Sequence, residues 1–369
     1  MDLRPFELER YFAKWEFAVE HVLCASDCET RSVRELSTME PSLTERLADL
    51  RLGYVDSRGS PSLRAAIARL YSKIDADDVL VFTGAQEAIL WVYSALVSAG
   101  DRVVVETPCY ASHWEVPRAR GANVVAWRTD LERASFEDVA LDERTRLVAV
   151  NLPHNPTGVL LSQDAWRGLV GEVASSGAVL FSDEVFRGLE HDRAARLPAA
   201  CDLDERAISL GVMSKSYGLA GLRVGWIATR NKAAYERVAA LKDYSTICGS
   251  APSELLAEVA LAHGDRILEE NVARILSNLE LCDAFFARHE DLFEWRRPRA
   301  GCVAFVGLRR GEVGAFCSEL VEATGVLLLP GQVFGADQNH FRIGFGRSTF
   351  AEGLARLDEF VNRWSNRQR

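Results

Sequence analysis

The sequence lacks long apolar runs and basic blocks. No stretch approaches the ~20 consecutive apolar residues that a membrane-spanning helix needs, so we expect no membrane span. The N-terminal segment is charged and lacks the apolar core of a secretory signal peptide. Lysine and arginine (43 residues) are outnumbered by aspartate and glutamate (53 residues), which gives a formal net charge of −10. This balance argues against nucleic acid as a partner, because no basic block is present to neutralise phosphates.

Cysteine is present, but its spacing forms no recognisable framework. The eight cysteines are irregularly spaced without a CxxC motif, and Cys24 and Cys28 have no second cysteine pair that would complete a zinc site with them. Scattered reduced thiols are typical of a cytoplasmic protein, so we expect neither a disulfide framework nor a metal site. The phosphate-binding patterns GxxxxGKS/T and GxGxxG at a helix start are also missing, which argues against a nucleotide-binding protein.

Short apolar runs alternate with helical stretches from about residue 60 onward. Ser60 and Pro61 predict a helix start, with Ser60 as the capping residue. Further helices are expected from about Ala85 and near 163–175. Short buried strands that are separated by helices are typical of an α/β protein with a mostly parallel central sheet flanked by helices. We expect strands at 79–82, 103–106, 123–127, 147–152, 178–183, 207–212 and 224–229.

The pattern changes after about residue 252. A long helical stretch leads to shorter strands at VAFVGL, VLLLP and HFRIGFG, and a closing helix is expected at about 351–364. This order predicts a second, smaller α+β domain, which the N-terminal residues join. The predicted division is a large domain at 46–255 and a small domain made of 1–45 and 256–369.

Five groups that are far apart in the sequence follow the expected strands. They are Gly84-Ala85-Gln86, Tyr110, Asn155, Asp183 and Lys215. Ligands of open parallel sheets bind beyond the carboxyl ends of the strands, so we expect these groups to form one site. Pyridoxal 5'-phosphate (PLP) needs a lysine to hold its aldehyde as an imine and an acid beside its pyridine nitrogen. Lys215 and Asp183 fit these needs, although each taken alone has an ordinary alternative, a solvated surface lysine and a strand-terminal turn or cap.

Candidates exist for the other needs of this cofactor. The amides of Gly84–Gln86 at a helix N-terminus can bind its phosphate, with Arg223 as the cation. Asn155 can donate to the ring oxygen, Tyr110 can stack on the ring, and Arg342 can clamp a substrate carboxylate. The ordinary alternatives are a glycine turn, a surface salt bridge, an Asn-Pro turn, a core aromatic and an edge-strand arginine.

Five segments together resemble the signature blocks of one enzyme family. YVDSRGSPSLRAAIA, NLPHNPTG, SDEVFRG, MSKSYGLAGLRVGW and HFRIGFG are similar, in order and spacing, to those of class I/II aminotransferases. The resemblance runs from about residue 50 to the end of the chain. It implies PLP as the cofactor, the PLP-dependent transferase fold type I and a homodimer with active sites at the interface.

The resemblance also implies a role for each candidate residue. Lys215 would be the Schiff-base lysine and proton shuttle, and Asp183 would be the partner of the pyridine nitrogen. Asn155 would donate to the ring oxygen, Tyr110 would stack on the ring, and Arg223 with the Gly84–Gln86 amides would bind the phosphate. Arg342 would bind the substrate carboxylate, and Tyr54 would be the tyrosine that reaches the neighbouring subunit's phosphate.

Two positions depart from the family's common pattern. Phe186 stands where a tyrosine usually donates to the ring oxygen, and loss of that donor should raise the pKa of the cofactor imine. Val212 stands where a phosphate-binding Ser or Thr is usual, although Ser214 remains. The phenylalanine also occurs in a subgroup that processes arginine-like substrates, namely capreomycidine-synthase-like cyclases and PLP-dependent arginine oxidases. Segments of this chain resemble those of the cyclases.

The reaction stays open at this point. The leading hypothesis is an aminotransferase that passes the amino group of an L-amino acid to a 2-oxo acid through a Cα carbanion. The rival is a lyase, cyclase or oxidase of an arginine-like amino acid, and a third alternative is a non-catalytic ligand-binding module. Asp27 or Glu29 in the N-terminal segment is a hypothetical partner for a substrate guanidinium; an acidic loop with helix-capping residues is the alternative.

Overall fold

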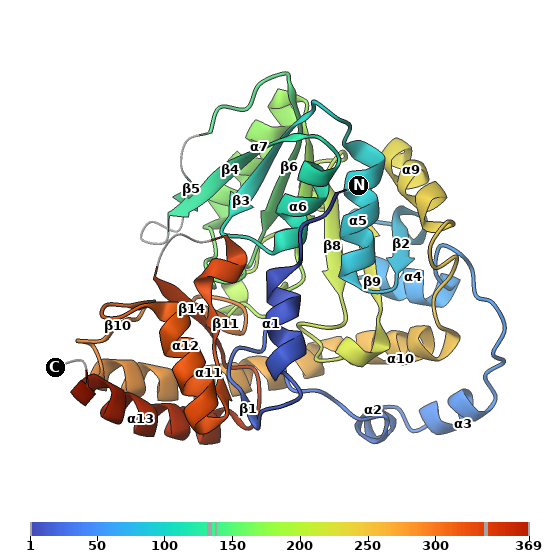
Figure 1. Ribbon diagram of the computed structural model, residues 1–369. Coiled ribbons are helices and arrows are strands. Elements are labelled where there is room, and N and C mark those ends of the chain that lie inside the picture. Colours follow the sequence, from blue (N-terminus) through green and yellow to red (C-terminus); the bar gives the residue numbers. More distant parts are fainter. Residues whose placement is uncertain (1, 131–134, 137–138, 336–338, 368–369) are drawn as a thin grey trace.

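The computed structural model describes residues 2–130, 135–136, 139–335 and 339–367 of the chain. Its largest element is an eight-stranded sheet with the order β2-β9-β8-β7-β6-β3-β4-β5 (Figure 1). The strands are β2 (Val79–Phe82), β3 (Arg102–Thr107), β4 (Asn123–Asp130), β5 (Ser135–Phe136), β6 (Thr145–Asn151), β7 (Val179–Asp183), β8 (Ile208–Val212) and β9 (Gly225–Ala228).

The neighbouring strands of this sheet are mostly parallel. β4, β3, β6, β7 and β8 form four consecutive parallel pairs. β9 runs antiparallel to both of its neighbours, β2 and β8, and β5 runs antiparallel to β4. The predicted mostly parallel α/β sheet is therefore confirmed, and the carboxyl ends of β3, β6, β7 and β8 lie at one edge of it.

Helices cover both faces of the sheet because its strands are apolar on both sides. Val103 and Val105 belong to the core cluster that contains α5 (Ala85–Leu96) and α9 (Lys232–Lys242), whereas Val104 belongs to the cluster that contains α7 (Gln163–Ser176). This alternation is the period of two that a strand dictates. Near β2 and β9, the second face is covered by α4 (Pro61–Ala68) and α10 (Ala251–Ala262).

Local signals set two helix starts in different ways. α7 starts as the sequence indicates, since the Ser162 side chain accepts a hydrogen bond from the amide of Ala165. The predicted capping of α4 is correct in position only. Pro61 occupies the first turn, but the Ser60 side chain makes no capping hydrogen bond. Instead, the Ser60 amide donates to the Glu254 carboxylate at 2.7 Å, a tertiary contact that local sequence does not reveal.

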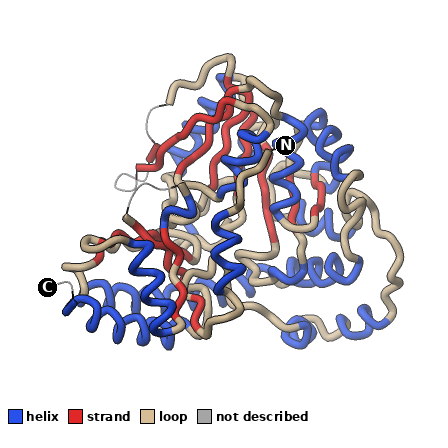
Figure 2. Tube along the Cα trace, in the orientation of Figure 1, coloured by secondary structure: helices blue, strands red, loops and turns tan. Residues whose placement is uncertain are grey.

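A second, smaller sheet is antiparallel and lies in the C-terminal part (Figure 2). Its order is β10 (Phe293–Glu294), β11 (Val303–Leu308), β14 (His340–Gly344) and β13 (Leu329–Pro330). The helices that accompany it are α11 (Gly264–Arg288), α12 (Val313–Thr324) and α13 (Phe350–Arg367).

The N-terminal segment contacts both parts of the molecule. β1 (His21–Val22) pairs in parallel with β12 (Val326–Leu327) of the C-terminal part. The segment also forms the helices α1 (Glu7–Trp15), α2 (Val33–Met39) and α3 (Leu43–Ala48). Leu36 of α2 and Leu43 of α3 pack in the same cluster as Leu63 of α4. The domain boundaries given above stay a prediction.

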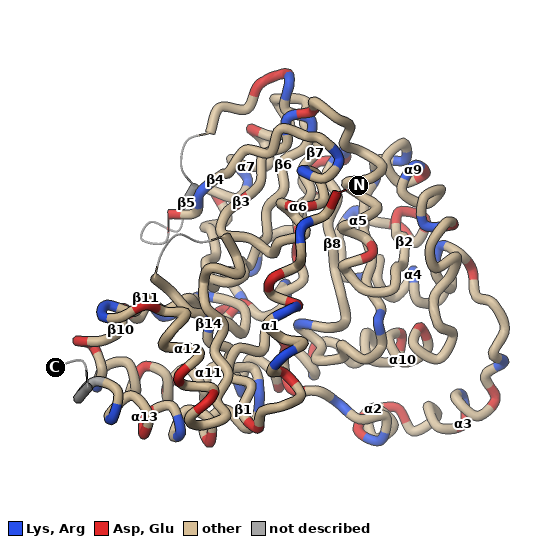
Figure 3. Tube along the Cα trace, in the orientation of Figure 1, with Lys and Arg blue, Asp and Glu red and all other residues tan. Residues whose placement is uncertain are grey.

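Charges of both signs are distributed along the whole trace (Figure 3). Among the described helices, none combines the length and the apolarity needed to cross a lipid bilayer. In the same part of the chain, no group of three or more His, Cys, Asp or Glu side chains is arranged to hold a metal ion.

Residues 23–29 form a strap between the two parts of the molecule. The Gly344 amide donates to Leu23 O, the Cys28 amide to Lys215 O, and the Glu29 amide to Gly346 O. The contact is so close that a Cβ on Gly344 would lie 1.9 Å from Ala25 O. A Cβ on Gly218, whose φ is +67°, would lie 2.1 Å from Glu29 O. Glycine is required at both positions because backbone packs directly on backbone.

We therefore expect Gly344→Ala to lower the free energy of unfolding by about 2–3 kcal/mol, the cost of overpacking a rigid contact. Gly171→Ala is the matched control. Gly171 lies within α7, where a Cβ added to it would have nothing within 4 Å, and its exchange should stabilise the protein by about 0.5–1 kcal/mol. Urea denaturation followed by circular dichroism measures both effects. Equal stability of the two variants would contradict the close contact.

Candidate active site

A pocket of about 360 Å³ opens at the edge where the parallel strands end. Most of the sequence-predicted site residues line it. They are Asp27, Ala85, Gln86, Tyr110, Asn155, Asp183, Phe186, Ser214, Lys215, Arg223 and Arg342. Residues from both the large sheet and the C-terminal part therefore converge on one cavity.

Lys215 reaches this pocket from the loop that follows β8. Its Nζ donates a hydrogen bond to Ser26 Oγ of the strap at 2.9 Å. Burial lowers the pKa of Lys215, and the positive charge of Arg342 acts in the same direction. A lysine with a lowered pKa is more often the neutral amine, which is the form that attacks a carbonyl or accepts a proton.

Asp183 ends β7 and is held by a chain of hydrogen bonds. Its Oδ2 lies 3.0 Å from His113 Nε2, and His113 Nδ1 lies 3.1 Å from the Tyr93 hydroxyl. The Val185 amide donates to Asp183 Oδ1. The buried carboxylate therefore has a fixed orientation with one edge toward the pocket. Sequence reasoning missed His113, although its place three residues after Tyr110, at the start of α6 (Ala111–Ala119), was a usable signal.

The N-terminus of α5 offers groups that are suited to an anion. The amides of Ala85 and Gln86 are in the first turn of this helix, whose dipole favours negative charge. Arg223 adopts a positive φ of 53°, and a Cβ on Gly84 would lie 2.3 Å from its Nη2. Glycine at position 84, where φ is +81°, thus lets the guanidinium approach the helix start. The Gln86 side chain is hydrogen-bonded to Ser112, so Gln86 would bind an anion through its backbone amide and not through its side chain.

Asn155 and Arg342 are connected by a hydrogen bond. Arg342 Nη1 donates to Asn155 Oδ1 at 3.0 Å, so the Asn155 amide presents its NH2 group as the remaining donor. Arg342 is buried, with two further donor contacts to Cys24 O of the strap. The alternative of an edge-strand arginine is wrong, because Arg342 pairs with Phe305 of β11 on one side and with Leu329 of β13 on the other.

Asn151 links the two ends of the pocket floor. Its Nδ2 donates to Asp183 O, and its Oδ1 accepts from the backbone N–H of Asn155, both at 2.8 Å. The Asn151 amide in turn donates to Glu106, and burial raises the pKa of that carboxyl to about 8. Sequence reasoning missed Asn151, the first residue of NLPHNPTG, because only Asn155 in that segment was assigned a chemical role.

One wall of the pocket is acidic. Glu9 of α1, Glu16 just after α1, and Asp27 of the strap all line it. Burial raises the pKa of Glu16, and the carboxylates of Asp27 and Glu9 raise it further. Asp27 accepts hydrogen bonds from Arg347 at 2.7–3.2 Å. Within the described residues, the Glu9 and Glu16 carboxylates have no hydrogen-bond or ion-pair partner. Sequence reasoning proposed Asp27 but missed both glutamates.

Three predicted residues do not line the pocket: Gly84, which precedes Ala85, and Glu29 and Tyr54. Glu29 belongs to the strap, but its carboxylate accepts from the Ser348 amide at 2.6 Å and does not line the cavity. Tyr54 lies on the surface with 90% of its area exposed. An exposed tyrosine beside exposed Leu52 is a surface that a neighbouring subunit can cover.

The residues present fit PLP. The pocket offers an amine of lowered pKa, an oriented carboxylate, an anion site with a guanidinium, and an amide NH2 that has no other partner among the described residues. These four features meet the needs of its aldehyde, pyridine nitrogen, phosphate and ring oxygen. Phe186 is buried in the pocket wall and offers no hydroxyl, and Val212 lines the pocket where Ser214 and Arg223 supply the polar groups.

Relatives of known activity are similar over most of the chain. A capreomycidine synthase from Streptomyces vinaceus is 34% identical, which covers 95% of this chain and 92% of the relative. An arginine–pyruvate transaminase, AruH, from Pseudomonas aeruginosa is 31% identical and covers 82% of this chain and 81% of the relative. Among solved structures, the PLP-dependent cyclase OrfR superposes with a TM-score of 0.90 at 33% identity and covers 98% of both chains.

The sequence model of one family spans nearly the whole chain. The model described as aminotransferase class I and II matches residues 22–357. This match agrees with the relatives, with the mostly parallel sheet and with the residues at its carboxyl edge. The protein therefore belongs to the class I and II aminotransferase family, has the fold of its PLP-dependent members, and uses pyridoxal 5'-phosphate as its cofactor.

Proposed function

We propose that the protein converts a cationic, arginine-like L-amino acid, by elimination or cyclisation at the side chain. The observation that carries the proposal is the acidic wall of Glu9, Glu16 and Asp27 in the same pocket as Lys215. Glu9 and Glu16 are exposed residues on the rim of the pocket, and two carboxylates there without partners among the described residues favour a substrate with a positive side chain. One of the relatives described above is also named as a transaminase of arginine.

Most of the predicted residues that line the pocket receive a role in this proposal. Lys215 binds the cofactor and later removes the proton from the substrate's Cα. Asp183, oriented by His113, keeps the pyridine nitrogen protonated, and Asn155 donates to the ring oxygen while Tyr110 stacks on the ring. Arg223 with the Ala85 and Gln86 amides holds the phosphate. Arg342 binds the substrate carboxylate. PLP, when bound, supplies a ring that accepts the electron pair left at Cα.

Elimination and amino transfer differ in what happens after the Cα proton is lost. In elimination, a leaving group at Cβ departs with an electron pair, and a guanidine nitrogen can take its place to close a ring. This path needs no amino acceptor. The similarity to capreomycidine synthase over 95% of the chain and to the cyclase OrfR supports it. Amino transfer to a 2-oxo acid is the second candidate, which the relation to arginine–pyruvate transaminase supports.

Turnover without an acceptor separates these two reactions. We expect repeated turnovers when the enzyme is mixed with a β-hydroxylated arginine and no 2-oxo acid, with product measured by mass spectrometry. Arginine without a leaving group is the matched control. A single equivalent of oxo acid with accumulated pyridoxamine phosphate would instead establish amino transfer.

The acidic wall is tested by comparing arginine with citrulline, its neutral isostere. We expect Glu16→Gln to reduce the preference in kcat/KM for the arginine-type over the citrulline-type substrate by roughly tenfold or more, since a charge-assisted hydrogen bond is lost. Glu7→Gln is the control, because Glu7 lies at the other end of α1 and does not line the pocket. An unchanged preference in Glu16→Gln would remove the wall from substrate recognition.

The cofactor linkage is tested independently of turnover. We expect borohydride treatment of the holoenzyme to add the mass of reduced cofactor to the peptide that contains Lys215. Lys215→Ala should show neither this adduct nor the absorption of the bound cofactor. Lys73→Ala, at an exposed lysine outside the pocket, should retain both. An adduct on another lysine would contradict the assignment.

A further inference from the structure

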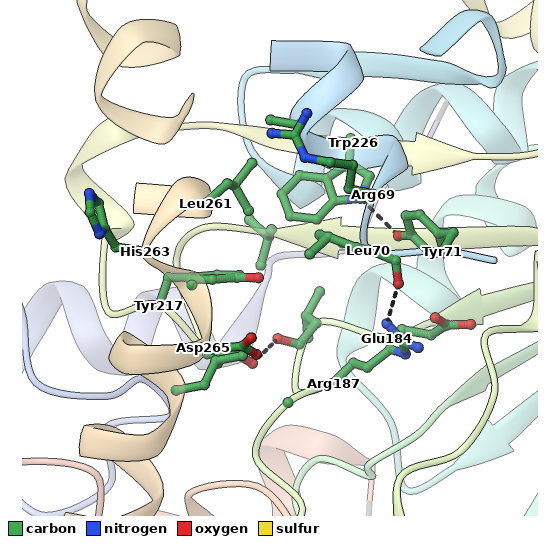
Figure 4. A pocket seen from close by; sticks show the side chains of 18 of the residues that line it. Arg69, Leu70, Tyr71, Glu184, Arg187, Tyr217, Trp226, Leu261, His263 and Asp265 are labelled. Carbon is green, nitrogen blue, oxygen red and sulfur yellow. Dashed lines mark hydrogen bonds between the residues drawn. The ribbon is translucent and has the colours of Figure 1, made fainter. Parts of the chain in front are cut away.

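A second pocket of about 510 Å³ lies beside the active site, between the end of α4 and the junction of α10 with α11 (Figure 4). Val185 and Val212 line both pockets, so the two cavities share a wall. The second pocket also contains Glu184, which follows Asp183, and Ser216 with Tyr217, which follow Lys215 closely. Nothing in the proposed reaction uses this cavity.

Aromatic rings form one side of this pocket. Tyr71, Trp226 and Tyr217 line it, and Leu261 and Leu268 add apolar surface. Trp226 Nε1 donates to the Tyr71 hydroxyl at 2.9 Å, which fixes both rings. The indole packs directly on β8, since a Cβ on Gly211 would lie 2.4 Å from it. These contacts make a firm aromatic wall for a planar group.

The pocket presents several unpaired hydrogen-bond donors, together with one unpaired acceptor, Glu184 Oε2. Tyr217 is 6% exposed, its hydroxyl has no hydrogen-bond partner among the described residues, and Figure 4 shows it pointing toward the middle of the cavity. The Tyr71 hydroxyl accepts from Trp226 and still has its own proton to donate. Arg187 Nε is buried without a partner, while its Nη1 donates to Leu70 O. Three free donors require a ligand that is rich in acceptors.

The charges around the pocket favour an anion. Of the two carboxylates, Glu184 accepts from the Ala200 amide and the Ser209 hydroxyl through Oε1 only, its buried Oε2 has no partner among the described residues, and burial raises its pKa. Asp265 lies 3.6 Å from Arg193. Within the described part of the chain, Arg69 has no hydrogen-bond or ion-pair partner. The lining also contains Arg187, Arg196, His263 and Arg266, but Arg196 and Arg266 are paired with Glu190 and Glu270 at 2.9 Å, and His263 lies 3.9 Å from Glu40. Among the described residues, Arg69 and Arg187 are therefore the arginines of the lining that are left to face an anion.

We propose that this cavity is a second ligand site, separate from the substrate site, which binds a small planar carboxylate. The donors of Tyr71, Tyr217 and Arg187 receive the carboxylate, and the planar part lies against Trp226. A ligand there touches the loop of Lys215 through Ser216 and Tyr217. Its binding is therefore expected to change the absorption of the bound cofactor without entering the active site.

Benzoate is the probe for this site, used with the holoenzyme and measured by titration calorimetry. We expect binding, with a change in cofactor absorption that saturates at the same concentration. Tyr217→Phe and Arg69→Gln should each weaken it by roughly tenfold or less, the usual effect of one hydrogen bond or one partly exposed charge. Arg58→Gln, an arginine outside the cavity that pairs with Glu236, is the matched control and should bind like the wild type.

Several results would overturn the proposal. Absence of binding at millimolar benzoate would do so. Binding that both pocket variants leave unchanged would place benzoate elsewhere, for example at Arg342. Equal affinity for neutral benzamide would overturn the requirement for an anion, and equal affinity for inorganic phosphate would overturn the role of the aromatic wall. The cofactor spectrum of each unliganded variant shows that the active site is intact.

Discussion

The backbone contact between the strap and its two neighbours sets the geometry of the whole active site. The strap passes between β14 and the loop of Lys215 at distances that leave no room for a side chain on Gly344 or Gly218. Its Cys24 carbonyl binds Arg342, its Ser26 hydroxyl binds Lys215, and its Asp27 faces the cavity. One short segment therefore fixes the separation between the carboxylate clamp, the amine and part of the acidic wall.

The groups suited to the cofactor and the groups suited to the substrate come from different parts of the molecule. The large sheet supplies the groups suited to the cofactor, because the carboxyl ends of its parallel strands lie together. The groups suited to the substrate come from the N-terminal segment and from β14, which are far from that sheet in sequence. A family with this arrangement can keep one cofactor site and change its substrate by altering α1 and the strap.

Much of the fold could be predicted because its signals are local. The apolar run at 79–82 coincides with β2, and the predicted helix at 163–175 coincides with α7 to within one residue. Lys215 and Asp183 were identifiable because a strand end is a place that sequence can locate. Their supporting contacts were not predictable, since His113, Asn151 and Ser26 meet their partners only in the folded chain. Glu9 of α1 and Glu16 just after it were missed for a similar reason, because an amphipathic helix does not show what its polar face meets.

The hydrogen bond from Arg342 to Asn155 joins the residue proposed to bind the substrate carboxylate to the residue proposed to bind the cofactor's ring oxygen. Because the side-chain oxygen of Asn155 accepts from Arg342, the side-chain amide has one favoured orientation, with its nitrogen toward the cavity. Loss of the guanidinium would free this amide to rotate by half a turn and present its oxygen instead. The amide oxygen would then face the ring oxygen to which, in the proposed arrangement, the NH2 group donates. Redesigning the enzyme for amines that lack an α-carboxylate thus needs a replacement donor at position 342 as well as space.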